Sequence, residues 1–337
     1  MSKITIQVRL YPTPEQARLL MAHGQEYIST VKAHLPSAVK NQALRDAYSV
    51  FKRSLDLGCI PLLKKPICQW SNQNWRMDQG MLLLPLSIEG KVEQTRIRCA
   101  DICLPGRVGI LRIKKKRGKW IADIALTIQN APPTDGKAIM GIDLGIKVPA
   151  VAHIRGQGTR FFGNGRYQRM MRRRFYAQRK KLQKAKKTRI VKKRQNKESR
   201  WMKDINHKLS RQIVNHAHSL SVGTIKVESL AGIRKGTTRT SRGASARKNN
   251  RMKNTWSFYQ LTLFVTYKAQ RLGIKVEQID PAHTSQECPA CSAHNKAQDR
   301  TYVCAECGWR GHRDSVGAMN ISRRAGLSDK RIGATGA

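Results

Sequence analysis

The sequence predicts an α/β protein in two parts, and three observations support this fold class. Residues 91–128 alternate apolar and polar positions with a period of two, which is typical of strands. The stretch QNAPPTDG at 129–136 has two prolines, a glycine and little apolar content, so it marks a boundary. Beyond it, three short strand candidates precede helix, strand, helix, strand and helix. This order is typical of the ribonuclease-H-like α/β fold.

The first part begins as a strand and continues as a helix. Apolar residues alternate with polar ones over ITIQVRL at 4–10. The TPEQ segment that follows predicts a helix start, because Thr13 can cap the helix and Gln16 completes a capping box. Helical, basic sequence continues to about residue 57, and Arg117-Gly118 then separates two strand-like runs. The first part is therefore expected to be a strand-rich body with helices inserted between its first and later strands.

Short strands separated by helices make up the second part. Gly273 is expected to end the second-last helix, and the tail from Ala325 is expected to be frayed. The predicted elements are, in order, strands 138–144, 149–154 and 158–163, a basic helical region to about 220, strand 222–228, helix 253–272, strand 274–279, a cysteine-rich segment and a short final helix.

Charge and apolar content exclude several classes of protein. The chain has 337 residues, of which 40% are hydrophobic, so it can form two or three domains with cores. Its 65 Lys and Arg residues against 21 Asp and Glu residues give a formal net charge of +44, which favours a nucleic-acid partner. The longest apolar run, 81–84, is far shorter than the ~20 residues of a transmembrane helix. The N-terminus also lacks the apolar block of a signal peptide, so we expect a cytoplasmic protein without a membrane partner.

The eight cysteines fall into two groups. Two Cys-x2-Cys pairs are separated by twelve residues, the spacing of a zinc ribbon in which two knuckles hold one tetrahedral ion. A closed set of four thiolates leaves no open position for water, so this zinc is expected to be structural. The predicted ligands are Cys288, Cys291, Cys304 and Cys307. The remaining cysteines, interpreted as buried thiols or as a second metal site, are Cys59, Cys68, Cys99 and Cys103.

Three acidic residues stand out in this basic chain. Asp143 follows an apolar strand candidate in AIMGIDLG, Glu228 repeats the arrangement in GTIKVESLAGI, and Asp314 starts the final helix. In a ribonuclease-H-like sheet, the first strand, the fourth strand and the last helix can bring such acids to one edge. Converging carboxylates raise one another's pKa unless cations hold them, and two magnesium ions about 4 Å apart suit that arrangement in phosphodiester hydrolysis. The sequence predicts a two-metal nuclease site, and the alternative for each acid is a solvated surface charge.

At these residues the chain resembles the TnpB (OrfB) family of insertion-sequence-encoded RNA-guided endonucleases and, more distantly, the type V CRISPR effectors. GIDLGIK is similar to the first RuvC-type motif, IKVESLAGI to the second, and TSQECPAC, CAECG and HRDSVGAMNI to the third with its embedded zinc ribbon. VRLYPTPEQ resembles the family's opening, so the resemblance covers nearly the whole chain. Val316 and Gly317 stand where the family often has Asn and Ala, and neither change touches an acid or a cysteine.

The resemblance implies a role for each motif and a domain for each segment. Asp143, Glu228 and Asp314 are implied to be catalytic residues that bind magnesium, and the four ribbon cysteines are implied to bind zinc. The implied domains are a strand-rich wedge domain at 1–12 and 91–130, a helical recognition insertion at 13–90, a RuvC-like nuclease domain at 131–283 and 312–324, a zinc ribbon at 284–311 and a flexible tail at 325–337.

The resemblance also implies a function. Members of the family use a noncoding guide RNA, recognise a short flanking DNA motif and cut double-stranded DNA. The chain is thus expected to be an RNA-guided, magnesium-dependent DNA endonuclease of a transposable element. One alternative is an RNA-guided repressor that binds DNA without strong cleavage, and the intact acids argue against it. A transposase or a type V CRISPR effector with the same core is another alternative, and the oligomeric state stays open.

A basic segment between the first two acids fits a nucleic-acid partner. Residues 166–203 hold 18 Lys or Arg residues and one acid, Glu198. The interleaved aromatic residues are Tyr167, Phe175, Tyr176 and Trp201. Basic side chains neutralise phosphates, and aromatic rings can stack on bases. We favour packing over stacking for these rings, because an apolar helical stripe continues through Met202, Ile205, Leu209 and Ile213.

Overall fold

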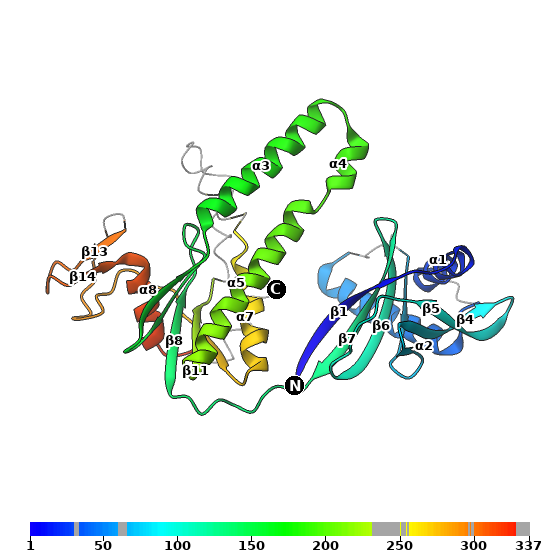
Figure 1. Ribbon diagram of the computed structural model, residues 1–337, viewed down its shortest axis with the longest axis horizontal. Helices are drawn as coiled ribbons and strands as arrows, with labels where there is room; N and C mark the ends of the chain where they lie inside the picture. The colour runs from blue at the N-terminus through cyan, green and yellow to red at the C-terminus, as the bar shows by residue number, and fades with distance from the viewer. Residues whose placement is uncertain are drawn as a thin grey trace. The chain divides into compact units, whose positions relative to one another are not determined.

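The chain folds into two compact units, Met1–Gln129 and Asn130–Ala337 (Figure 1). The computed structural model describes residues 1–29, 34–59, 66–230, 250, 254, 256–295, 297 and 300–327. Each unit has a hydrophobic core of its own. Within the described residues, the helices are either too short or too polar to span a bilayer.

Two antiparallel sheets form the body of the first unit. One sheet has the strand order β1, β7, β6, β2, and the other has the order β3, β4, β5. The end of β1 joins them, because Tyr11 N donates to Arg98 O at 2.8 Å and Leu10 pairs with Cys99. The strands are β1 Ser2–Leu10, β2 Ile67–Trp70, β3 Arg76–Asp78, β4 Met81–Ile88, β5 Lys91–Arg98, β6 Arg107–Lys116 and β7 Lys119–Ile128.

Local sequence fixes the turn between β6 and β7. Arg117 and Gly118 both adopt positive φ, at 56° and 73°. Two such residues in a two-residue loop match the right-handed twist of a hairpin. The predicted turn at Arg117-Gly118 is confirmed.

Two helices follow β1 in the chain, α1 (Pro14–Ile28) and α2 (Ser37–Leu57). The Thr13 hydroxyl accepts from Gln16 N, and the Gln16 side chain accepts from Thr13 N, so the predicted capping box is present. The hydroxyl of Tyr27 in α1 donates to Asp46 in α2, which ties the two helices together.

The segment 71–90 differs from the expected helical insertion, because it forms β3 and β4. Every residue from Leu82 to Leu86 is buried, so this apolar run has no period of two that would mark a strand. The indole of Trp70 in the first sheet donates to the carbonyl of Pro85 in β4 at 3.2 Å, which links the two sheets.

A five-stranded sheet organises the second unit. Its order is β10, β9, β8, β11, β12, with β8, β11 and β12 parallel and β9 and β10 antiparallel to their neighbours. Along the chain, these strands follow one another in the order that the sequence predicts. The strands are β8 Ala138–Asp143, β9 Ala150–Ile154, β10 Gly158–Phe162, β11 Val222–Glu228 and β12 Lys275–Ile279.

Different helices cover the two faces of this sheet. Ile142 of β8 packs with Leu209 of α5 (Lys197–Ser219) and Leu261 of α7 (Phe258–Arg271). Its neighbour Gly141 faces the other way, as alternation along a strand requires. A Cβ at Gly141 would lie 2.2 Å from the carbonyl oxygen of Ala318 in α8 (Arg313–Arg323), so glycine lets α8 approach β8 directly. Figure 1 shows α8 on one side of β8 and β11, with α5 and α7 on the other.

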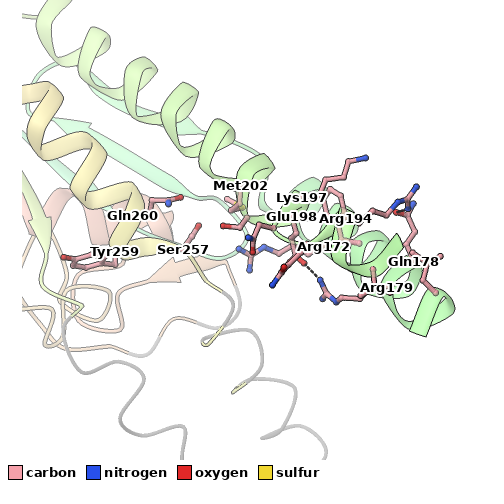
Figure 2. Close-up of a pocket in the computed structure, with 16 residues that line it drawn as sticks. Arg172, Gln178, Arg179, Arg194, Lys197, Glu198, Met202, Ser257, Tyr259 and Gln260 are labelled. Atoms are coloured by element: carbon pink, nitrogen blue, oxygen red, sulfur yellow. Dashed lines mark hydrogen bonds and ion pairs between the residues drawn. The ribbon is translucent and has the colours of Figure 1, made fainter. Parts of the chain in front are cut away.

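Helices α3 (Gly165–Lys184), α4 (Thr188–Arg194) and α5 carry the basic segment. An ion pair of 3.3 Å between Arg179 and Glu198 joins α3 to α5 (Figure 2). The Trp201 ring centroid lies 5.9 Å from that of Phe175 and 6.2 Å from that of Tyr167, so these rings pack together. Tyr176 is exposed, at 43%. The predicted stripe is confirmed, with Met202, Leu209 and Ile213 buried and Ile205 half-buried.

The zinc-ribbon segment forms a hairpin of β13 (Thr301–Val303) and β14 (Arg310–His312). Tyr302, Cys288 and Cys304 form a small core together with Val316 of α8. The ribbon therefore packs directly on the helix that carries Asp314. Val316 supplies an apolar contact at the position where it departs from the family motif.

A buried lysine lies between α5 and α7. Lys268 Nζ donates to the His207 carbonyl at 2.6 Å and to the Ser210 hydroxyl at 2.7 Å, and it lies 5.9 Å from the Phe264 ring centroid. Burial lowers the pKa of Lys268 to about 8, and the charge of Arg211 acts in the same direction. The folded protein thus releases this proton more readily than the unfolded chain does.

Replacing Lys268 by methionine is expected to change how stability depends on pH. The ordinary lysine pKa is 10.5, so between about pH 8 and that value the unfolded chain binds a proton that the folded protein does not. The contribution of Lys268 to the free energy of unfolding therefore rises with pH across that window, and it is lost as pH falls through about 8. The melting temperature of the native protein should rise relative to that of Lys268→Met over this window. A constant difference would contradict the assignment, and Lys208→Met, at an exposed position of α5, is the matched control.

Candidate active site and metal centre

Asp143 and Glu228 stand at the ends of neighbouring strands. Asp143 is the last residue of β8, and Glu228 is the last residue of β11. The strands are parallel, and Ile142 lies opposite Val227. Both acids therefore reach the same edge of the sheet.

Helix α8 brings Asp314 to this edge. Asp314 lies in the first turn, where its backbone N–H donates to His312 Nδ1 at 3.2 Å. One turn later, a Cβ at Gly317 would lie 3.0 Å from Oδ2 of Asp143. The glycine that departs from the family motif thus leaves room for the Asp143 carboxylate against α8.

Two of these acids, Asp143 and Glu228, have raised pKa values. Burial raises the pKa of Asp143 to about 8, and the charges of Glu228 and Asp314 contribute to that rise. Burial also raises the pKa of Glu228, against a hydrogen bond from Thr284. A nearby cation would favour the charged forms of Asp143 and Glu228.

The acids do not form a closed cluster of ligands. Within the described part of the chain, the three carboxylates are not among the groups whose ligand atoms all lie within 4.8 Å of one another.

Sequence reasoning missed two side chains that contact the acids. The Thr284 hydroxyl donates to Oε1 of Glu228, and the Arg300 guanidinium forms an ion pair with Asp314. Thr284 belongs to the TSQECPAC motif, so its place before the first cysteine pair was a usable signal. Arg300 lies in the loop between the two cysteine pairs, where no pattern marks it.

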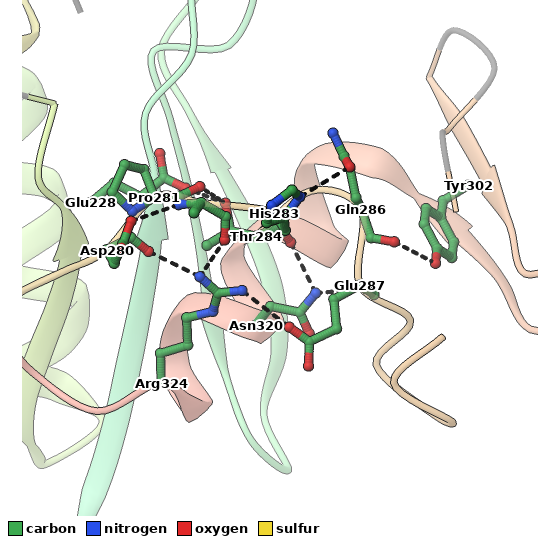
Figure 3. Close-up of polar contacts among 11 residues, drawn as sticks. Glu228, Asp280, Pro281, His283, Thr284, Gln286, Glu287, Tyr302, Asn320 and Arg324 are labelled. Carbon is green, nitrogen blue, oxygen red and sulfur yellow. Dashed lines mark hydrogen bonds and ion pairs between the residues drawn. The ribbon is translucent and has the colours of Figure 1, made fainter. Parts of the chain in front are cut away.

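The end of α8 holds the loop that carries Thr284 (Figure 3). Asn320 Nδ2 donates to the Thr284 carbonyl at 2.9 Å and to the Glu287 carbonyl at 2.7 Å. Arg324 donates to the Asp280 carbonyl and to the Glu287 carboxylate, each at 3.1 Å. These contacts fix the backbone around Thr284, so the hydroxyl is held in place beside Glu228.

The four ribbon cysteines do form a closed cluster. Their sulfur atoms all lie within 4.8 Å of one another. The Sγ distances are 3.7 Å for Cys288 and Cys307 and 3.5 Å for Cys291 and Cys304. Thiolates at ~2.3 Å from a tetrahedral zinc lie roughly 3.8 Å apart, so the geometry suits such an ion. A backbone hydrogen bond from Cys307 lowers the pKa of Cys304, whereas contacts with neighbouring thiols raise the pKa of Cys291 and of Cys307.

The other cysteines only partly match the expectation of buried thiols. Cys68 and Cys99 are buried, as predicted, whereas Cys59 and Cys103 are exposed. Cys59 follows the end of α2, and Cys103 lies in the segment between β5 and β6. Cysteine is a small apolar residue, so the exposure of these two thiols could not be predicted from the residue type.

Two family models match separate parts of the chain. The model of OrfB_IS605, described as a probable transposase, matches residues 123–234. The model of the Cas12f1-like TNB domain matches residues 258–321, which include the four cysteines and Asp314.

The proteins that resemble the chain include two curated relatives and one solved structure. The CRISPR-associated endodeoxyribonuclease Cas12f1 of Sulfoacidibacillus thermotolerans is 27% identical over 227 residues, which cover 61% of this chain and 50% of that protein. The TnpB-like protein MJ0751 of Methanocaldococcus jannaschii is 29% identical over 137 residues, 40% of this chain and 47% of that protein. The cryo-EM structure of a Cas12f1–sgRNA–target DNA complex aligns with a TM-score of 0.64 at 14% identity, covering 85% of this chain and 71% of that one.

The fold is therefore that of a Cas12f effector. The resemblance to the TnpB (OrfB) family and to the type V effectors is confirmed. The chain spans about half the length of the curated relatives that it matches.

Proposed function

We propose that this protein is an RNA-guided, magnesium-dependent endonuclease that cuts double-stranded DNA. The observation that carries the proposal is the convergence of Asp143, Glu228 and Asp314 at one edge of a ribonuclease-H-like sheet. The names of the relatives add support, since they include CRISPR-associated endodeoxyribonucleases and TnpB-like proteins. The transposase label of the matching family model supports a role in a transposable element.

Magnesium fits the three acids, because hard cations prefer carboxylate oxygens. When bound, two such ions supply an activated water and stabilise the leaving oxygen of a phosphodiester. Asp143, Glu228 and Asp314 would hold them, and the burial of Asp143 makes a bound cation the natural counter-charge. Thr284 would orient the Glu228 carboxylate. When a metal ion binds, Arg300 would either move away from Asp314 or share the Asp314 carboxylate with the ion.

Zinc fits the cysteine cluster, and its proposed role is structural. Four sulfur ligands at near-tetrahedral separations leave no position for a substrate or a water. The ion would hold both knuckles against Val316 and so fix the start of α8, where Asp314 lies.

The proposed domains follow the two units. In the first unit, strands β1, β5, β6 and β7 would form the wedge domain, and helices α1 and α2 would belong to the recognition insertion. In the second unit, the five-stranded sheet with its helices would be the nuclease domain, into which the ribbon is inserted before α8. The proposed recognition insertion also includes strands β2 to β4.

A guide RNA and a DNA duplex are the proposed partners. The net charge of +44 exceeds what a short duplex contact needs. In the order of the chain, the basic helices α3 to α5 come after the strand that carries Asp143 and before the strand that carries Glu228. A heteroduplex held by its backbone lets base pairing choose the sequence while the protein reads only a short flanking motif.

The protein is expected to purify with a structured RNA. Treating the purified complex with RNase or with DNase, and sequencing what survives, identifies the bound nucleic acid. A single RNA species with a constant scaffold and one variable end supports the proposal. Recovery of random RNA fragments in proportion to their abundance would instead favour a nonspecific basic nuclease.

Replacing Thr284 by valine is expected to slow DNA cleavage by roughly 10- to 100-fold, the usual effect of losing a partner of a metal ligand. Valine keeps the branched shape and removes the hydroxyl that donates to Glu228. More magnesium should be needed for half-maximal rate, while nucleic-acid binding stays the same. Thr284→Ser should retain activity, and Ser285→Ala tests the neighbouring hydroxyl. Native magnesium dependence in Thr284→Val would remove the positioning role.

A further inference from the structure

A cleft of about 640 Å³ lies among α3, α4, the first turn of α5 and the start of α7 (Figure 2). The described residues that line it all belong to the second unit, and none of them is one of the three acids or the four cysteines. The volume is within the ~300–1,000 Å³ of small-molecule and cofactor sites. The cleft is therefore large enough for one nucleotide and separate from the site of the acids.

One wall of the cleft is apolar. Phe175 and Leu182 lie two turns apart on α3, and Val191 of α4 and Met202 of α5 also line the space. Trp201 packs against Phe175 with ring centroids 5.9 Å apart, which limits how far the Phe175 ring can turn away. A half-buried aromatic ring beside aliphatic side chains is a surface on which a planar base can stack.

The polar part of the cleft is strongly positive. Among the described residues, four cations and one acid, Glu198, line it; the cations are Arg172, Arg179, Arg194 and Lys197. Glu198 pairs with Arg179 at 3.3 Å, so the negative charge of this carboxylate compensates only part of the positive charge in the cleft. Burial lowers the pKa of Arg172, and Glu198 only partly offsets this.

Two of these guanidinium groups are held in place by the cleft itself. Arg194 donates to the Gln178 side chain at 3.1 Å, across from α4 to α3, while Arg179 is held by Glu198. Held guanidinium groups lose less freedom when they bind a phosphate, and their planar fork matches phosphate oxygens. Repulsion among the cations also opposes closure of the cleft when it is empty.

A ligand that contains both an aromatic base and an anionic group would complement this cleft, because the base can pack on the apolar wall and the anion can bind the cations. We propose that the cleft binds one unpaired nucleotide of the nucleic acid held by this protein, with its base against Phe175 and its phosphate at the arginines. The proposal rests on the proposed function only in requiring a bound nucleic acid. The nucleotide can come from unpaired guide RNA or from a displaced DNA strand, since both present the same base and phosphate.

Photo-crosslinking with the full-length protein tests this site. In one arm, cells grow with 4-thiouridine, and the protein is purified with its own labelled RNA. In the other arm, single-stranded DNA carrying 4-thiothymidine is added to the protein. After irradiation, mass spectrometry should find crosslinks in the peptides containing Phe175 or Met202, and the productive arm identifies the source. Crosslinks confined to other regions would overturn the proposal, whereas their absence everywhere would contradict the proposed function as well.

Neighbouring aromatic residues supply the matched variants. Phe175→Ala should weaken binding of the labelled nucleic acid by roughly 5- to 150-fold, the range for losing one stacked base. Tyr176→Ala, next to it but not lining the cleft, should change binding by less than about twofold. Phe175→Trp keeps a ring and should keep both binding and crosslink. Equal losses in Phe175→Ala and Tyr176→Ala, with circular dichroism unchanged, would show that the cleft holds no base.

Discussion

Replacing Asp143, Glu228 or Asp314 by alanine is expected to abolish DNA cleavage and to leave nucleic-acid binding nearly unchanged. Each replacement removes a proposed magnesium ligand from a shared edge without removing a contact to phosphate. Cleavage and binding of the same labelled DNA are measured side by side, and chelation of magnesium should reproduce the loss.

A surface carboxylate provides the control for these variants. Asp204 pairs with Lys208 on the exposed side of α5, so Asp204→Ala removes one acid and should cut at the native rate. Strong magnesium-dependent cutting by any of the three alanine variants would remove that residue from the site. Loss of binding together with cutting would instead indicate a general effect on the fold.

Replacing Cys304 by serine is expected to release the bound zinc and to unfold the ribbon. Zinc binding contributes about 10–16 kcal/mol in small structural sites, more than the sparse ribbon core can replace. Because that core includes Val316, its loss should also free the start of α8 and stop cleavage. Elemental analysis should find about one zinc in the native protein and little in the variant.

An exposed cysteine outside the ribbon separates a thiol effect from a metal effect. Cys103→Ser, in the first unit, should keep the zinc and the native resistance to protease. Full zinc content and native protease resistance in Cys304→Ser would contradict a structural role for the cluster.

The fold of the second unit was predictable because its signals are local. Five strands lie within one or two residues of their predicted bounds, since each is a short segment that contains β-branched or aromatic residues. The cysteine cluster was predictable for a similar reason, because two short motifs with a fixed spacing specify a tetrahedral geometry.

Features that depend on tertiary context were less accessible. Strand β4 is buried on both faces, so its apolar run lacks the alternation that reveals a strand. Arg300 reaches Asp314 only through the path of the loop between the cysteine pairs, which no periodicity describes. The same holds for the cleft beside Phe175, because it exists only where α3, α4 and α5 come together.

Gly317 shows why a departure from a family pattern is hard to interpret from the sequence. In the sequence it is a helical glycine, which is expected to weaken a helix by about 1 kcal/mol relative to alanine. In the structure it faces the Asp143 carboxylate at a distance that leaves little room for a Cβ. Its effect depends on a contact between residues far apart in the chain, and only the fold shows that contact.

Exchange of the guide segment tests the central claim, RNA-guided cutting, most directly. The RNA is stripped from the purified protein, and RNAs with the same scaffold and different guide segments are restored with magnesium. The cuts are then mapped on DNA that carries a matching target beside a randomised flank, with Asp143→Ala as the inactive reference. We predict that cutting requires the RNA, follows the guide and selects one short flanking motif. Equal cutting by RNA-free protein, or cut sites that ignore the guide, would contradict this account.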